Sequence, residues 1–303
     1  MARHILYIVN PISGTRTKKD LRKLIEERTA GEKIPFQIFP SVASGDYSFL
    51  QNYIEENGVT DVVVAGGDGT VSQVVSSLMG YRLNFGIIPC GSGNGLAYAA
   101  GIPKQAAKAL EIVFYGKAVS TDGFYINKQF ACMLCGLGFD AKVAHDFAQQ
   151  PKRGLATYIK EVVKNFFSAT SYTFELELHS QKFRTEAFFI SVANSNQFGN
   201  NFTIAPKASL SDGMLDIVIV TDQSKLSLLL QTFRQVMGKI KLQSLPAIDT
   251  GKAVIYFQTD HLFIRNISEA PLHVDGDPAE TPDELDIQVK KKCFRLLQAR
   301  EKE

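Results

Sequence analysis

The sequence predicts an α/β protein with two parts: an N-terminal doubly wound, mostly parallel sheet domain and a C-terminal antiparallel β-sandwich-like domain. In residues 1 to about 116, short apolar strands alternate with helical segments, which is typical of a parallel sheet covered by helices. After about residue 118, strand patterns follow one another with two helical interruptions, which is typical of antiparallel structure. We place the domains at 1–120 and 121–290 and expect the segment at about 291–303 to pack back on the first domain.

Composition limits the classes of function. The chain has 303 residues, of which 45% are apolar and 21% are charged, and its net charge of +2 argues against a dedicated nucleic-acid-binding protein. No apolar run reaches the length of a membrane span, and the N-terminus does not resemble a signal peptide. We therefore expect a cytoplasmic protein with reduced cysteines. The pair Cys132 and Cys135 lies in an apolar strand, so buried thiols are favoured over a metal or redox site.

The first domain is expected to contain four buried or half-buried strands and several helices. The strands are His4–Val9, Phe36–Phe39, Val62–Ala65 and Phe85–Ile88. Four helices are expected: from about Arg16 to Ala30, at Tyr47–Asn57, after Gly69 and at Gln105–Phe114. In the second, the side chains of Phe49, Leu50, Tyr53 and Ile54 should face inward. The third should have Thr70 or Ser72 near its cap.

Turns rich in small residues follow three of these strands, beginning near Asn10, Gly66 and Gly91. Because the carboxyl ends of parallel strands meet at one edge of a sheet, these turns should lie together at a ligand crevice. The run from Gly66 to Thr70 contains three glycines, which allow close approach of the backbone to a ligand, and a helix N-terminus favours phosphate. Asp68 would repel phosphate unless a divalent cation lies between, so the turn indicates an Mg-nucleotide. A purely structural turn is the alternative.

The second domain is expected to consist mainly of strands, interrupted by helices at about Gly154–Ser168 and Ser224–Gly238. The expected strands are Asp122–Tyr125, Lys128–Leu137, Tyr172–His179, Lys182–Ala193, Met214–Val220, Lys252–Gln258, His261–Asn266, Pro271–Val274 and Leu285–Val289. Basic and aromatic residues on the first helix, or leucines on the second, could contact a membrane surface. Packing of the same residues in the core is the alternative.

Several motifs, in order along nearly the whole chain, resemble the diacylglycerol kinase and sphingosine kinase catalytic-domain family, including its bacterial soluble lipid kinases. They are NPISG at Asn10, GGDGT at Gly66, PCGSGNGLA at Pro89, PKRGLATY at Pro151, the segment from Asn194 to Asp216, and VDGD at Val274. The GGDGT motif alone is less specific, because NAD kinases share it. The resemblance implies ATP and Mg²⁺ as cofactors and a lipid alcohol as substrate.

Carried over residue by residue, the resemblance implies catalytic, nucleotide-binding and metal-binding groups. Asp275 matches the proton acceptor, Asp68 would hold the catalytic Mg²⁺ through water, and Asp277 stands where the family usually has the longer Glu. The implied ATP site comprises Asn10, Ser13, Gly14, Ser41, Gly66, Gly67, Asp68, Gly69, Thr70 and Ser92. A structural Mg²⁺ site is implied at Ser209, Asp212 and Met214. By spacing alone, Asp275-Gly276 and Asp212-Gly213 are equally typical of hairpin turns.

Two departures leave the substrate open. Thr15 stands where relatives often carry a phosphate-binding lysine, for which Arg16 or Lys18 could substitute, and Gly95 makes the third turn closer to the sphingosine-kinase form. We expect a lipid kinase that phosphorylates diacylglycerol or a long-chain base at a membrane surface. A kinase of a soluble metabolite such as NAD, and a lipid-binding protein without turnover, are the alternatives. The oligomeric state stays open, with a homodimer among the options.

Overall fold

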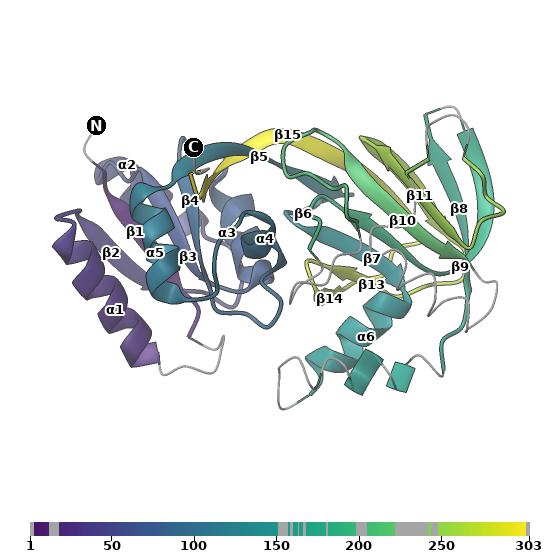
Figure 1. Cartoon of the computed structure of the whole chain (residues 1–303), viewed down its shortest axis with the longest axis horizontal. Helices are drawn as coiled ribbons and strands as arrows, with labels where there is room; N and C mark the ends of the chain where they lie inside the picture. Colours follow the sequence, from purple (N-terminus) through teal and green to yellow (C-terminus); the bar gives the residue numbers. More distant parts are fainter. Residues whose placement is uncertain are drawn as a thin grey trace. The chain divides into compact units, whose positions relative to one another are not determined.

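The computed structural model describes residues 3–11, 18–150, 157, 160–162, 164–165, 168–179, 181–197, 205–221, 242–243 and 248–300. Two compact units make up the chain. Unit 1 comprises Met1–Thr121 with Lys292–Glu303, and unit 2 comprises Asp122–Lys291. Two strands, β5 (Lys117–Ile126) and β15 (Glu284–Gln298), pass from one unit into the other (Figure 1).

Unit 1 is built on a parallel sheet in the order β15-β4-β3-β1-β2. Its other strands are β1 (Ile5–Val9), β2 (Phe36–Pro40), β3 (Asp61–Gly66) and β4 (Asn84–Pro89). Every residue of β3 is buried, because helices cover both faces of the sheet at its centre. The strands β1, β3 and β4 therefore run side by side and end at the same edge, as the sequence predicted.

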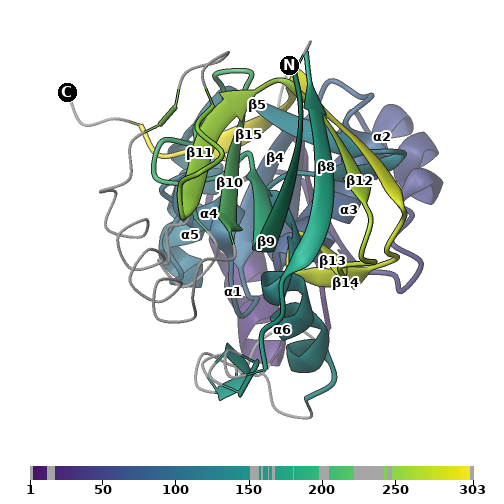
Figure 2. The ribbon, with the colours of Figure 1, turned by 90° about the vertical axis from the view of Figure 1, so that its right-hand side faces the viewer.

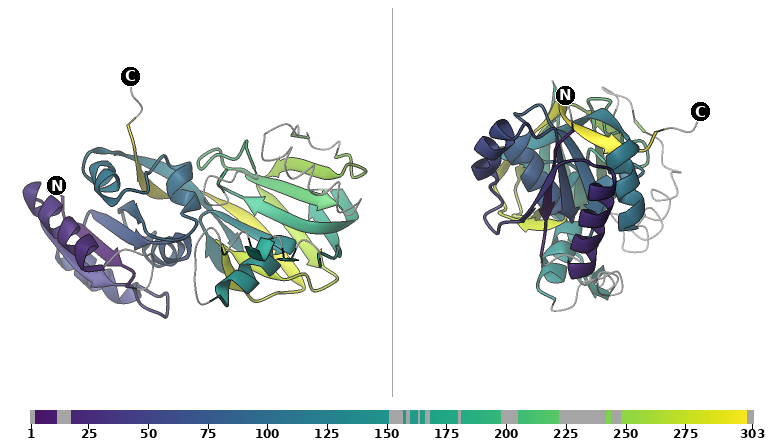
Figure 3. Two further views of the ribbon diagram at one scale, coloured as in Figure 1. Left: turned by 60° about the horizontal axis from the view of Figure 1, so that its bottom comes forward. Right: turned by 90° about the vertical axis from the view of Figure 1, so that its left-hand side faces the viewer.

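The helices of unit 1 lie on both faces of this sheet. In Figure 3, α1 (Lys18–Gly31) and α5 (Ala106–Tyr115) lie on one face, where Arg28 on α1 pairs with Glu111 on α5. The other face carries α2 (Gln51–Glu56) and α3 (Asp68–Leu78), and the short α4 (Gly95–Ala99) follows β4. The doubly wound arrangement expected from the sequence is confirmed.

The helix expected at Tyr47–Asn57 differs in its first turn. Residues Ser48–Leu50 form the 3₁₀ turn η1, and α2 begins only at Gln51. Asp46 accepts hydrogen bonds from the backbone N–H and hydroxyl of Ser48, which stabilises this tighter turn. Because a 3₁₀ turn has about three residues per turn rather than 3.6, side chains in it change direction. Phe49 is consequently 55% exposed, and the prediction that it faces inward is wrong.

Unit 2 is built mainly from antiparallel strands, which Figure 2 shows side by side. The principal order is β14-β13-β7-β9-β8-β12-β15, with β10 pairing both β9 and β11, and with β5 pairing β6 and β15. The strands are β6 (Gln129–Ala131), β7 (Leu134–Gly138), β8 (Tyr172–Leu178), β9 (Gln181–Ala193), β10 (Leu215–Thr221), β11 (Val254–Thr259), β12 (His261–Asn266), β13 (Leu272–Val274) and β14 (Asp277–Ala279). Their apolar residues form two buried clusters, and the sandwich-like antiparallel domain is confirmed.

One helix of unit 2 was not expected. The stretch predicted as the single strand Lys128–Leu137 is divided into β6 and β7, and α6 (Phe139–Ala148) follows directly. Gly138 allows this sharp turn because it has a φ of +94°, and a Cβ there would lie 2.4 Å from the carbonyl oxygen of Phe188. The helix packs against β7, β13 and β14, below them in Figure 1. Of the two helices that were expected, the second lies outside the described residues, and the first is helical at 157, 160–162 and 164–165.

The final strand is longer than the sequence indicated. Instead of ending at Val289, β15 continues to Gln298 and pairs in parallel with β4 through Arg295 and Leu296. The segment expected to pack back on the first domain thus joins the sheet of unit 1 beside β4. None of the helices in the described part of the chain is long and apolar enough to cross a membrane.

The contribution of β15 to unit 1 is open to a direct test. Leu296 is fully buried, so Leu296→Ala should lower the free energy of unfolding of unit 1 by about 2–5 kcal/mol, as expected for a large apolar side chain removed from a packed core. Arg295 is exposed on the same strand, so Arg295→Ala is the control. Urea denaturation monitored in unit 1 measures both, and equal stabilities would contradict a core role for this segment.

Candidate active site

In unit 1, the turns after β1 and β3 are joined by asparagine and threonine. The backbone N–H of Asn10 donates to the carbonyl oxygen of Ala65 at 2.9 Å, and its side-chain Nδ2 donates to Oγ1 of Thr70 at 2.9 Å. Thr70 lies in the first turn of α3. The structure therefore brings together two residues that the sequence assigned to one nucleotide site.

The turns after β3 and β4 touch through their backbones. The N–H of Cys90 donates to the carbonyl oxygen of Gly66 at 2.9 Å. A Cβ built on Gly91 would lie 2.6 Å from Cα of Gly67, closer than real Cβ atoms come to backbone. Glycine is thus required at this contact for packing, and the same lack of side chains leaves the backbone accessible for a close approach by a ligand.

Asp68 is the first residue of α3, and its carboxylate binds the beginning of α4. Oδ2 accepts a hydrogen bond from the N–H of Gly95 at 3.0 Å, and Oδ1 accepts one from Leu96 at 3.1 Å. The cap of α3 is Gly67 in an extended conformation, so the helix begins before Thr70 and Ser72, the residues expected near its cap. An acid in the first turn is favoured by the helix dipole. Asp68 therefore has a structural function in addition to any contact with a cation.

Asn94 completes the third turn and was not singled out from the sequence. It is 2% exposed and has a φ of 55°. Its Oδ1 accepts the N–H of Gly91 at 2.7 Å, and its Nδ2 donates to the carbonyl oxygen of Gly91 at 2.8 Å. Asparagine tolerates the left-handed region better than most residues, and its placement after two glycines was the available signal.

Of the remaining residues assigned to the nucleotide site, the structure describes Ser41 and Ser92. The N–H of Ser41 donates to the carbonyl oxygen of Val9 at 3.0 Å, so Ser41 lies just beyond the end of β1. Ser92 lies in the turn after β4 and is partly exposed. Ser13 and Gly14, together with Thr15 and Arg16, lie outside the described residues.

In unit 2, Asp275 is both the corner of a hairpin and a buried carboxylate. Asp275 and Gly276 have φ values of 50° and 85°, and they connect β13 to β14 with Val274 opposite Asp277. The residue is only 5% exposed. Oδ2 accepts the N–H of Cys132 at 3.0 Å, while Oδ1 accepts those of Met133 at 2.9 Å and Leu134 at 3.0 Å. Three N–H donors stabilise the negative charge of a carboxylate and fix its orientation.

Other titratable groups surround Asp275. Burial raises the pKa of the Cys135 thiol, and the charges of Asp275 and Asp140 raise it further. Nε2 of His273 lies 3.4 Å from Oδ2 of Asp140, and Gly136 leaves space for this pair, since a Cβ there would be 2.0 Å from the same oxygen. Cys132 and Cys135 are both about 1% exposed, in agreement with the expected buried thiols.

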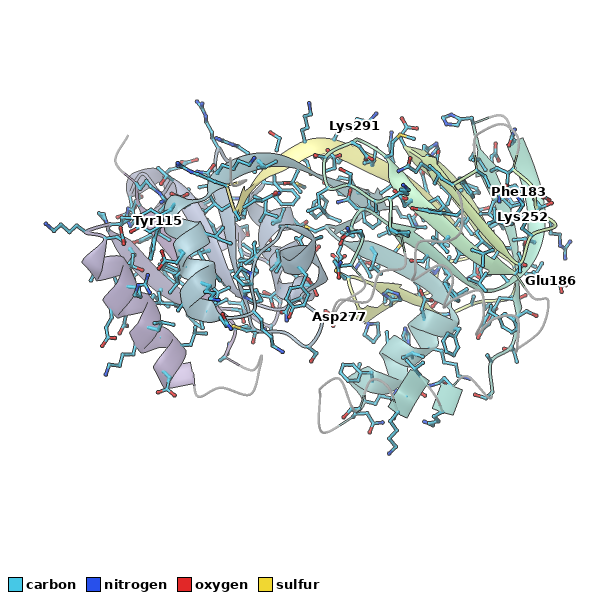
Figure 4. The ribbon with its side chains drawn as sticks, viewed as in Figure 1. Tyr115, Phe183, Glu186, Lys252, Asp277 and Lys291 are labelled. Carbon is cyan, nitrogen blue, oxygen red and sulfur yellow. The ribbon has the colours of Figure 1, made fainter. Side chains whose placement is uncertain are left out.

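Asp277 lies at the beginning of β14, where Figure 4 labels it. It is exposed, whereas Asp275 two residues earlier is buried. The hairpin turn thus places the two carboxylates in different environments.

The expected structural metal site lies beside a second acid. Oδ1 of Asp212 accepts the N–H of Met214 at 3.0 Å, and the hydroxyl of Ser209 accepts the N–H of Ser211 at 3.4 Å. Buried Asp122 accepts the N–H of Gly213 through Oδ2 at 2.7 Å. Partial desolvation raises the pKa of Asp212, and the charge of Asp122 raises it further. A hard cation with oxygen ligands would relieve this repulsion.

Among the described residues, no cluster of three or more His, Cys, Asp or Glu is arranged to hold a metal.

Comparisons with known proteins match this arrangement in both units. The model of the "Diacylglycerol kinase catalytic domain" matches residues 4–126, and that of the "YegS C-terminal NAD kinase beta sandwich-like domain" matches residues 134–295. A protein of Chromohalobacter salexigens named "Probable lipid kinase YegS-like" is 26% identical over 257 residues, covering 83% of this chain and 79% of that protein. "Probable lipid kinase YegS" of Escherichia fergusonii is 26% identical over 261 residues, covering 82% and 85%.

A crystal structure of a diacylglycerol kinase from Bacillus anthracis str. Sterne shares the fold, with a TM-score of 0.73, 20% identity, and coverage of 98% of this chain and 97% of that one. The architecture is that of a diacylglycerol kinase catalytic domain followed by a β-sandwich-like domain. The chain belongs to the YegS-like lipid kinase family, and it is a kinase. The resemblance inferred from the sequence motifs is confirmed.

The contact between the glycine turns gives a test of the site in unit 1. Gly91→Ala should lower the stability of unit 1 by about 1–3 kcal/mol, because the new methyl group would overlap the backbone of Gly67. Gly80→Ala is the control, since nothing lies within 4 Å of a Cβ at Gly80. Thermal melting with and without ATP measures stability and nucleotide protection. If the Gly91→Ala protein has the same melting temperature as the Gly80→Ala protein and the same increase with ATP, the turns do not need this contact.

Asp216 provides a test of pH dependence in unit 2. Burial raises its pKa to about 6, although the hydroxyl of Tyr256 and Nε2 of Gln258 both donate hydrogen bonds to it. Because the pKa of Asp216 is higher in the folded than in the unfolded protein, protonation of this carboxyl group stabilises the folded state. That stabilisation is complete at pH values below the pKa of the unfolded protein, and it is lost as pH rises through about 6. The expected loss is ~3 kcal/mol, from a shift of roughly two units.

Urea denaturation without Mg²⁺ between pH 4 and 7.5 measures this contribution. Asp216→Asn should show a weaker fall of stability with rising pH than the wild type, because the amide does not ionise. Comparison with the wild type isolates Asp216 from Asp212, whose pKa is also raised. The same slope for both proteins would contradict the assignment.

Proposed function

We propose that this kinase transfers the γ-phosphoryl group of ATP, with Mg²⁺, to a hydroxyl of diacylglycerol or of a long-chain base at a membrane surface. The observation that carries the proposal is the buried Asp275 carboxylate, oriented by three backbone N–H groups at a hairpin corner. A lipid hydroxyl is a weak nucleophile, so an ionised carboxylate held in place is suited to accept its proton. The family membership supplies the reaction class.

The residues at the carboxyl ends of β1, β3 and β4 fit a bound nucleotide. The turns after β3 and β4 contact one another through Gly67 and Gly91, so phosphate oxygens could approach the backbone N–H groups of Gly67, Gly69 and Ser92. Asn10 and Thr70 would border this site, with Ser41 near the adenosine and Ser13 and Gly14 in the first turn. Bound Mg²⁺ would neutralise charge between the β- and γ-phosphates. Asp68 would hold it through water, since two backbone N–H groups already orient that carboxylate.

In unit 2, Asp275 would act as general base and Asp277 would assist from its exposed position on β14. The side chain of Asp277 is one methylene shorter than the usual Glu of the family, so its carboxylate would reach less far toward a substrate. Asp212, with backbone carbonyls of Ser209 and Met214, would hold a structural Mg²⁺ next to Asp122. The raised pKa of Asp212 supports this site, because a cation would favour its charged form.

The identity of the acceptor distinguishes the proposal from its rivals. The names of the relatives favour a lipid, whereas the family description of unit 2 mentions NAD kinase and so keeps a soluble acceptor as the second candidate. Contact with a membrane would involve the segments around Lys160 and Lys164 and around Leu226. In the described part of these segments, Lys164 pairs with Asp146 and Glu161.

The experiment that tests the function is transfer of labelled γ-phosphate from ATP to a panel of acceptors. The panel contains diacylglycerol and sphingosine in mixed micelles, and NAD in solution, each with Mg²⁺ or with EDTA. Label in a lipid that disappears with EDTA is the expected result. Label only in NAD would favour the soluble-metabolite kinase. Binding of lipid without transfer to any acceptor would favour a non-catalytic lipid-binding protein.

Asp275→Asn tests the general base. The variant should lower kcat by roughly 10²–10⁴ with little change in affinity for ATP, because the amide does not accept the proton. The structure also predicts a lower melting temperature, since an amide oxygen cannot accept all three N–H groups and the amide NH₂ would face one of them. Asp283→Asn, at an exposed position in unit 2, is the control. Wild-type turnover by a folded Asp275→Asn protein would exclude this role.

A further inference from the structure

The short connector between β6 and β7, Cys132–Met133, is hydrogen-bonded on both sides of its backbone. Its two N–H groups, with that of Leu134, donate to the Asp275 carboxylate. Its two carbonyl groups accept hydrogen bonds from Asn194 and Ser195 instead. The N–H groups of Asn194 and Ser195 both donate to the carbonyl oxygen of Met133, at 2.9 and 3.0 Å. The direction of the N–H groups that bind Asp275 therefore depends on what holds the carbonyl side.

Asn194 supplies most of that support. It directly follows β9 and is 0% exposed. Its Nδ2 donates two hydrogen bonds of 2.9 Å, one to the carbonyl oxygen of Cys132 and one to that of Asp122. With its own backbone N–H on Met133, Asn194 thus binds both carbonyl groups of the connector.

Asp122, whose carbonyl oxygen is the other acceptor of Nδ2, is held by hydrogen bonds of its own. The N–H of Asp122 donates to the carbonyl oxygen of Leu210 at 2.7 Å, and its carboxylate accepts the N–H of Gly213 at 2.7 Å. Asp122 is 0% exposed. Asn194 therefore ties the connector to a fixed point on β5 rather than to a mobile surface loop.

We propose that Asn194 is a positioning residue for Asp275. Each peptide carbonyl is rigidly coupled to the N–H of the following residue. By holding the carbonyl groups of Cys132 and Met133, Asn194 therefore keeps the N–H groups of Met133 and Leu134 aimed at the Asp275 carboxylate and maintains the orientation of that group. This inference rests on the proposed function of Asp275 as general base. Only a side chain with two amide hydrogens at this length makes both Nδ2 contacts: Ser offers one donor, Ala none, and Asp would place a negative charge against two carbonyl oxygens.

The chain offers a matched control in Asn266. This residue is 2% exposed, lies in the same unit at the end of β12, and holds a turn through two side-chain hydrogen bonds to the backbone of Ala270, both of 2.9 Å. Its substitution should lower the stability of unit 2 in the same way. No hydrogen bond connects it to the Cys132–Met133 connector in the described structure, so it should leave Asp275 unaffected.

The first experiment compares Asn194→Ser and Asn194→Ala with Asn266→Ser and Asn266→Ala in the full-length protein. The readout is kcat as a function of pH with the lipid that the acceptor panel identifies. In the Asn194 variants the acidic limb of the profile should move to higher pH, because weaker N–H bonding to the carboxylate favours its protonated form. A shift of about one unit lowers kcat about tenfold on that limb, while KM for ATP stays constant.

The neighbouring titratable groups Cys135, Asp140 and His273 are unchanged in all four variants, and so are Asp277 and Asp122. In the Asn266 variants any loss of kcat should be the same at every pH. If the Asn194 variants also lose kcat uniformly, with an acidic limb at the wild-type position, Asn194 is a structural residue only and the inference is overturned.

The second experiment does not depend on activity. Hydrogen exchange of the wild-type amides of Cys132, Met133 and Leu134 should be slow. Exchange of the Met133 amide, which shares a peptide plane with the Cys132 carbonyl group that the Asn194 side chain holds, should become faster by at least an order of magnitude in the Asn194 variants but not in the Asn266 variants. Rapid exchange of these amides in the wild type would overturn the inference even if every Asn194 variant failed to fold. Wild-type turnover by Asp275→Asn would instead refute the general base, and the exchange data would still show whether Asn194 holds the connector.

Discussion

Hydrogen bonding of carboxylates to backbone N–H groups is the interaction on which the arrangement of both candidate sites depends. Asp68 accepts two N–H groups at the beginning of α4, and Asp275 accepts three from the end of β6 to the beginning of β7. In each case the carboxylate joins two segments that are distant in sequence. Removing a carboxylate from water without such partners would cost free energy, so these bonds decide where each acid lies.

This interaction explains the local sequence around each acid. In unit 1, Asp68 can reach α4 only because the turns after β3 and β4 approach closely, which requires Gly67 and Gly91 in contact and Asn94 to close the third turn. In unit 2, the N–H groups offered to Asp275 are available because β6 ends at Ala131 and β7 begins at Leu134. The interruption of a strand that looked continuous is thus part of how the carboxylate is held.

Unit 2 also has a buried polar network that extends beyond its candidate base. Asp122, Asn194 and Asp216 are all fully buried, and each has hydrogen-bond partners on a different strand or turn. Apolar residues at these positions would form a core without buried polar groups. The presence of the three polar residues indicates that the turns around Gly213 and Met133 are fixed by polar contacts. The raised pKa of Asp216 means that ionising this buried carboxyl group at neutral pH lowers the stability of the fold.

The fold class, the positions of most strands along the chain, the meeting of the three turns and the family could all be predicted from the sequence, because short apolar strands, glycine turns and motif order are local features. From the sequence, Asp275 was either a hairpin corner or a proton acceptor; the structure shows the hairpin corner and adds that its carboxylate is buried and hydrogen-bonded, whereas the catalytic role stays a proposal. Features that depend on contacts between segments distant in sequence could not be predicted and are known from the structure alone. These include α6, the exposed Phe49, the extension of β15 into unit 1, and the pairing of Asn194 with the connector. A buried asparagine has no periodicity of its own, and its partners lie about 60 and 70 residues away in sequence.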